Sequence, residues 1–73
     1  MSLPFRCYRG GDRVRVVSAE MDTRKHPATG IIQGRNEFAR GFLVMHTPRD
    51  FVWWGVEDLE MENPLDALAR CET

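Results

Sequence analysis

"RDFVWWGVEDLE", residues Arg49–Glu60, places two adjacent tryptophans in a short apolar run with the length of a β-strand. Adjacent residues of a strand point to opposite faces of the sheet, so a single small core can bury at most one of Trp53 and Trp54. We assign Trp53 to the core and Trp54, beside Val52, to the outer face. The opposite assignment, with Trp54 in the core and Trp53 on the outer face, is equally compatible with this pattern. Either way, one indole must lie under a terminal segment or against a partner.

Short apolar runs separated by turn residues continue this pattern along the chain. Arg13–Ser18 alternates charged and apolar residues, which is the period of a half-buried strand. Gly30–Arg35, Phe42–Met45, Phe51–Trp54 and Leu59–Met61 are further candidate strands between turn signals. This spacing predicts an all-β fold, a small five-stranded SH3-like barrel with a short C-terminal helix. The expected inward side chains are Val14, Val16, Ile31, Leu43 or Val44, and Trp53.

The chain ends are expected to flank this barrel. Asn63 followed by Pro64 is typical of a helix start, and it predicts a two-turn helix over Pro64–Cys71. Its apolar stripe is expected to comprise Leu65, Leu68 and Ala69. Met21–Gly30 contains proline and glycine without periodicity, which predicts a long loop. Within one domain, the expected boundaries are an N-terminal arm at 1–10, the barrel at 11–62 and the helix or tail at 63–73.

A chain of 73 residues can form only a thin core, and such chains often gain stability from a metal, disulfides or self-association. The cysteines and histidines form no cluster at metal-ligand spacing, so we expect no metal and no cofactor. We expect a cytoplasmic protein, because no leader pattern and no membrane-spanning apolar run is present. In that compartment Cys7 and Cys71 are expected to be free thiols, although chain ends that meet could bridge them.

Charge is distributed unevenly along the sequence. Residues 1–49 hold nine basic and four acidic side chains, whereas residues 50–73 hold one basic and seven acidic ones. Strands from the two parts lie side by side in a five-stranded barrel, so basic and acidic side chains can alternate over the surface and need not form two separate patches. The net charge of −1 gives little support to a nucleic-acid-binding role.

Two stretches, "GDRVRVVS" at residues 11–18 and "TPRDFVWWGVEDLEMEN" at residues 47–63, resemble the plasmid-borne type II dihydrofolate reductases. The resemblance implies a tetramer of SH3-like barrels. The same opening motif occurs in the C-terminal part of nitrile hydratase β subunits, so it indicates the fold more than the activity. The matching positions are Gly11–Arg15, Ser18, Pro48, Val56, Leu59, Glu60 and Asn63.

Three positions depart from the ligand-binding residues of that family. Its fourth strand carries a Val-Gln-Ile-Tyr run, which here is Phe51–Trp54, so Val52 replaces the amide and Trp54 replaces the phenol. A lysine that helps that family bind its anionic ligands falls at Val16. Without these polar groups, nothing orients a nicotinamide or a pterin. We therefore expect no dihydrofolate reductase activity and assign no catalytic residue.

Three classes of function stay open. The preferred class is a small non-catalytic binding module or accessory subunit that contacts a protein partner or a second copy of itself. An exposed tryptophan beside a valine forms the kind of apolar patch that marks such interfaces. The second class is a nucleic-acid-binding barrel of the KOW or Tudor type, and the third is a type II reductase-like enzyme with an altered site. We expect no membrane partner. The expected interaction residues are Trp54, Val52, Trp53 and Tyr8.

Overall fold

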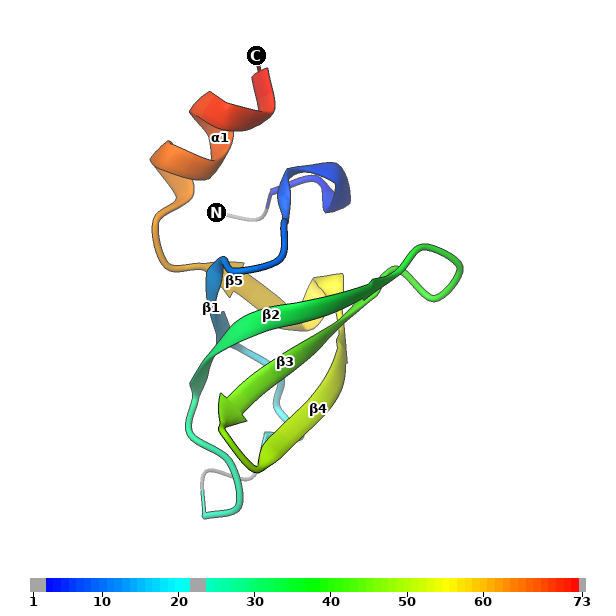
Figure 1. The fold of residues 1–73 in the computed structure, drawn as a ribbon, viewed down its shortest axis with the longest axis vertical. Coiled ribbons are helices and arrows are strands. Elements are labelled where there is room, and N and C mark those ends of the chain that lie inside the picture. Colours follow the sequence, from blue (N-terminus) through cyan, green and yellow to red (C-terminus); the bar gives the residue numbers. More distant parts are fainter. Residues whose placement is uncertain (1–2, 22–23, 73) are drawn as a thin grey trace.

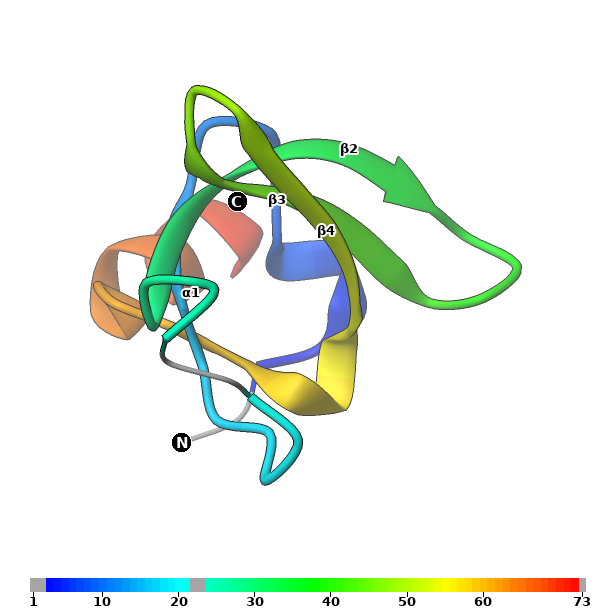
Figure 2. The same ribbon diagram turned by 90° about the horizontal axis from the view of Figure 1, so that it is seen from below.

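The computed structural model describes residues 3–21 and 24–72, so positions 22–23 of the expected loop and the outermost residues of both chain ends lie outside it. Five strands form one antiparallel sheet in the order β4-β3-β2-β1-β5, and its two end strands are not paired with each other. The sheet is strongly curled (Figure 1, Figure 2), and the buried side chains of its strands form the core. The mostly-β fold with a short C-terminal helix is therefore confirmed. Its elements are η1 (Phe5–Cys7), β1 (Arg13–Val16), β2 (Thr29–Asn36), β3 (Gly41–Thr47), β4 (Asp50–Gly55), η2 (Val56–Asp58), β5 (Leu59–Met61) and α1 (Pro64–Glu72).

Strand β1 follows the alternation that its sequence predicts. Val14 and Val16 are buried, whereas Arg13 and Arg15 are exposed. Val14 lies opposite Met61 of β5, and Val16 lies opposite Leu59. One β1 face thus supplies the core and the other carries charge. Among the described residues, no helix is long and apolar enough to cross a membrane.

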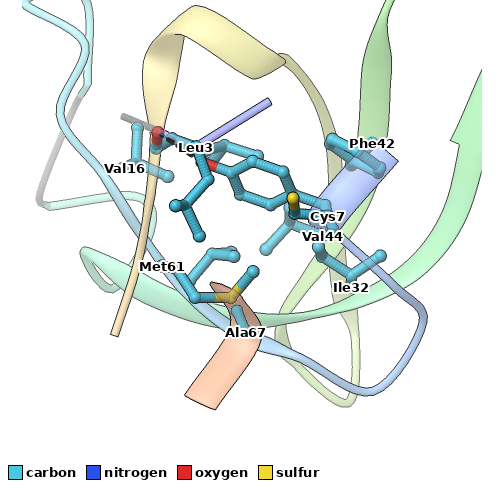
Figure 3. Close-up of a cluster of buried hydrophobic side chains, with 11 residues drawn as sticks. Leu3, Cys7, Val16, Ile32, Phe42, Val44, Met61 and Ala67 are labelled. Atoms are coloured by element: carbon cyan, nitrogen blue, oxygen red, sulfur yellow. Dashed lines mark hydrogen bonds between the residues drawn. The ribbon is translucent and has the colours of Figure 1, made fainter. Parts of the chain in front are cut away.

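The core gathers side chains from the sheet and from both chain ends (Figure 3). Ile32 of β2 and Phe42 and Val44 of β3 are fully buried. Tyr8 lies among them, stacked at an angle on Phe42, and its hydroxyl donates a hydrogen bond to the Leu59 carbonyl at 3.3 Å. Burial raises the pKa of the Tyr8 phenol above its ordinary value. The N-terminal segment therefore packs into one end of the curled sheet and contributes to the core.

On the central strands, Ile31 and Trp53 each lie one position from the residue that faces the core, whereas Val44, one of the two candidates on β3, is buried as expected. Phe42 pairs with Trp54 and Val44 with Val52 on the inner face, so Trp53 points outward. Ile32, not Ile31, faces the core. These strands are apolar at consecutive positions, so the sequence does not show which residues face the core. A shift of one residue moves every side chain of a strand to the opposite face of the sheet.

The two cysteines form a disulfide that joins η1 to α1, so the expectation of free thiols is wrong. The Cα atoms of Cys7 and Cys71 are 5.1 Å apart, within the ordinary range for a bridge. The bridge also sets the rotation of α1: Ala67, one turn before Cys71, is buried, whereas Leu65 is 75% exposed. Of the expected stripe, Leu65 and Ala69 are exposed and therefore wrong, whereas Leu68 packs against the core as expected. Ala67, Leu68 and Cys71 form the packed face of the helix.

Reduction of the disulfide should strongly lower the free energy of unfolding, because the intact bridge closes a loop of 64 residues in the unfolded chain. A loop of this length corresponds to about 4 kcal/mol, and a loss of that size should lower Tm by more than ~10 °C in so small a chain. Thermal unfolding with and without dithiothreitol measures this effect. The Cys7→Ser/Cys71→Ser double variant is the control, since the reductant should not change its Tm. An equal Tm for the oxidised and reduced protein would contradict the assigned role of the bridge.

Candidate functional site

The outer face of β2, β3 and β4 carries a continuous set of apolar side chains. Trp53 is 55% exposed and Phe51 is 47% exposed, both on the outer face of β4. Trp53 lies opposite Leu43, and Phe51 lies opposite Met45, which itself lies opposite Ile31 of β2. Directly opposed residues of an antiparallel pair share a face. We call this surface the outer patch; it comprises Ile31, Leu43, Met45, Phe51 and Trp53.

The Trp53 indole lies across β3 toward Gly34 of β2. Gly34 is opposite Leu43, just past a bulge in the β2–β3 pairing. A Cβ atom at Gly34 would lie 3.8 Å from the Cη2 atom of Trp53 and 3.5 Å from the Cβ atom of Leu43. The indole thus reaches from the sheet edge toward β2 and widens the apolar surface.

A cavity of about 250 Å³ adjoins the outer patch where the β2–β3 hairpin leaves the sheet. This hairpin extends away from the molecule (Figure 1), and Phe38 at its tip is fully exposed. The cavity offers backbone and amide groups beside the indole. Its lining residues are Asn36, Ala39, Gly41, Trp53, Trp54 and Gly55.

Trp54 takes the inner position and is held by a polar contact. Its indole Nε1–H donates to Nε2 of His46 at 2.9 Å, and Nδ1 of His46 lies 3.0 Å from the Thr29 carbonyl oxygen. An indole nitrogen can only donate and a carbonyl can only accept. His46 must therefore be the neutral tautomer with its proton on Nδ1. The half-buried indole is thereby satisfied and fixed in orientation.

A second histidine ties the β1–β2 loop to the start of β4. Nδ1 of His26 lies 2.6 Å from Oδ2 of Asp50, and both side chains are about three-quarters buried. The His26 ring is 5.5 Å from that of His46 and meets the edge of Trp54 at 6.5 Å, measured between centroids. These four side chains form one cluster that packs the loop against the β3–β4 hairpin.

The polar contacts of this histidine cluster are all made within the chain. Its hydrogen-bonding partners are a carboxylate, a backbone carbonyl and an indole, so within the described chain neither ring reaches a hydroxyl or a thiol. The residues described contain no group of three or more side chains that could hold a metal ion. The arrangement can anchor a loop.

A larger cavity, of about 600 Å³, lies between α1 and the start of β1. Arg70 of α1 donates to Oδ2 of Asp12 across it at 2.9 Å, and this bond raises the pKa of the Arg70 guanidinium. The backbone N–H of Arg9 donates to the same carboxylate oxygen. The Arg70–Asp12 bond thus fastens the helix to the segment that leads into β1.

Several arginines are engaged in local contacts. Arg13 pairs with Glu62 at 3.4 Å, and Arg35 pairs with Glu37 at 3.3 Å. The Arg35 guanidinium also lies 4.6 Å above the centroid of the Phe5 ring. These basic side chains lie beside acids or over an aromatic ring that already contacts the core.

The structure separates the residues that the sequence grouped as an interaction site. Trp53 is exposed in the outer patch, whereas Trp54 and Val52 occupy the half-buried inner face. Tyr8 is fully buried, so it offers no surface to a partner, and that assignment is corrected. Phe51 was missed, although its position two residues before Trp53 places both on the same face of a strand. Phe38 gave no signal beyond an aromatic residue in a turn.

Comparison with known proteins gives no relative: no protein-family model, curated protein or solved structure matches this chain.

Truncating the two tryptophans should have different effects. Trp54→Ala removes a packed indole and leaves His46 without its donor, so it should cost about 3 kcal/mol of unfolding free energy. Trp53→Ala removes an exposed ring and should cost less than ~1 kcal/mol. Urea unfolding of both variants measures the difference. Equal losses would show that both rings belong to the core.

The His46 tautomer can be checked directly. Nitrogen-15 NMR should show a protonated Nδ1 and an unprotonated Nε2 at His46, because their partners leave no other assignment. His46→Ala should leave the Trp54 indole N–H unpaired and cost about 1–2 kcal/mol. His26→Ala is the matched control, since it leaves the indole bond intact. Protonation of His46 at Nε2 in the folded state would contradict the network.

Proposed function

We propose that this chain is a non-catalytic binding module that contacts a protein partner through the outer patch. The observation that carries the proposal is the pair of exposed aromatic side chains, Phe51 and Trp53, side by side on β4. Leu43 and Met45 extend the same apolar surface onto β3. Contiguous apolar patches of this kind mark interaction sites, and tryptophan is enriched among the residues that dominate binding energy.

The packing of the chain ends supports this assignment. Both ends have apolar side chains that could cover a tryptophan, yet Leu3, Tyr8 and Ala67 join the core cluster. The N-terminal segment and α1 are tied to each other by the Cys7–Cys71 bridge. Trp53 consequently keeps more than half of its surface exposed, although both ends are docked.

We further propose that the curled sheet is an SH3-like barrel. The antiparallel order β4-β3-β2-β1-β5, the loop between β1 and β2, and the η2 turn before β5 support this assignment. Sheets of this type present binding surfaces on their strands and loops, so the proposed fold and the proposed function agree.

The positions compared with dihydrofolate reductases support a non-catalytic role. Val16 is buried, Val52 is half-buried and apolar, and the only polar atom of the Trp54 side chain is bonded to His46. None of the three presents a free polar group to a ligand. The ion-paired arginines likewise support ranking nucleic-acid binding below protein binding, because neutralised charges attract phosphates weakly.

Affinity capture with the immobilised chain tests the proposal. From an extract of the cells that encode it, the wild-type chain should retain a partner that Trp53→Ser and Phe51→Ser each lose. Val17→Ser is the matched control, because Val17 is an equally exposed apolar residue outside the patch. Circular dichroism should show all variants folded. Capture that is identical for wild type and the patch variants would refute binding through this surface.

A further inference from the structure

We infer that the outer patch is a self-association surface, at which strand β4 pairs antiparallel with β4 of a second copy about a two-fold axis at Val52. This inference rests on the proposed function and names the partner. Three features carry it: a free strand edge, a self-complementary aromatic pattern, and unpaired charges of opposite sign at the two ends of the strand.

The first feature is the edge itself. β4 is the last strand of the sheet, with β3 on one side only (Figure 1). Apart from its pairing with β3, the backbone of residues 51–54 makes no backbone hydrogen bond within the described chain. Proteins usually protect such edges with lysine, proline or inward-pointing charge. In β4 only Asp50, at its start, is charged, and its carboxylate is bonded to His26; Phe51–Trp54 has none of these features.

The second feature is the pattern along β4. A two-fold axis at Val52 places Phe51 of each copy opposite Trp53 of the other, and both residues point to the outer face. Four aromatic rings then meet in two cross-strand pairs, an arrangement that stabilises antiparallel sheets. Moving the axis to Trp53 would pair that residue with itself and leave Phe51 opposite Gly55. The register at Val52 therefore uses both exposed rings.

The third feature is charge at the ends of the strand. The same axis places Arg49, immediately before β4, opposite Gly55 of the second copy. Gly55 has no side chain, and the carboxylate of Glu57 lies over it: Oε1 is 3.0 Å and Oε2 is 3.3 Å from where a Cβ atom would be. Arg49 of one copy thus faces Glu57 of the other.

Both charges are available for this contact. Arg49 and Glu57 are exposed, and neither has an ion-pair partner within the described chain. The two-fold axis forms the Arg49–Glu57 pair twice, once at each end of the aromatic centre. On the inner face the same register sets Val52 against its own copy and Asp50 opposite Trp54. The Asp50 carboxylate already has His26 as its partner.

The exposed rings set the strength of the contact. Aromatic side chains bury roughly 150–250 Å² each when fully covered. Two half-exposed rings from each copy therefore supply only part of the ~1,200–2,000 Å² that stable interfaces bury. The backbone hydrogen bonds of the paired edges and the Arg49–Glu57 pairs must add to it. We expect a dimer that dissociates in the micromolar range.

Sedimentation velocity over a wide micromolar range tests the inference. The wild-type chain should shift from monomer to dimer as concentration rises, and Trp53→Ser should weaken the dimer about tenfold or more. Arg49→Glu and Glu57→Arg should each weaken it severalfold, because each sets like charges against each other. The double variant Arg49→Glu/Glu57→Arg should restore the wild-type affinity. Phe38→Ser, at the hairpin tip, is the matched control and should leave the dimer unchanged.

Three outcomes would overturn the inference. A chain that stays monomeric throughout excludes the second copy as partner; if Trp53→Ser still abolishes capture of another protein, the proposed function survives. A dimer that is insensitive to Trp53→Ser must use another surface. A double charge reversal that fails to restore affinity excludes the register about Val52.

Discussion

The pairing of β3 with β4 is the constraint on which the rest of this structure depends. Phe42 against Trp54 and Val44 against Val52 define the inner face, and no neighbouring residue can share it. Trp53 and Phe51 are therefore forced outward. Because Trp54 is turned inward, its indole N–H needs an acceptor, which His46 supplies. One choice of register thus creates the packed core, the histidine cluster and the exposed patch together.

The two chain ends complete the core and do not cover the outer patch. The disulfide draws η1 and α1 together at one end of the curled sheet, where Tyr8 and Ala67 fill the interior. A bridge of this kind persists in oxidising surroundings, so a reducing compartment would remove this constraint. With both ends used in this way, β4 keeps a free edge and two exposed rings. The proposed binding function follows from that division of the apolar side chains.

The sequence predicted elements well where one physical signal dominated. Alternation in β1, glycine and proline between strands, and Asn63-Pro64 before α1 gave strand and helix positions close to those observed. Faces were not predictable in the strands that are apolar at consecutive positions: Ile31 and Trp53 were assigned to the wrong face, and the sequence could not choose between Leu43 and Val44. The disulfide depends on contacts between residues 64 apart, which no local pattern encodes. The same bridge fixes the rotation of α1, so its stripe could not be predicted either.

The most direct test of this account is the accessibility of each indole in solution. Trp53→Phe and Trp54→Phe each leave a single tryptophan, whose fluorescence can be quenched by acrylamide in dilute protein. The account predicts that Trp53, which is 55% exposed, is quenched readily in Trp54→Phe. Trp54, observed in Trp53→Phe, should be protected until the protein is unfolded. A protected Trp53 beside a readily quenched Trp54 would show that the faces of β4 are reversed and would contradict the outer patch.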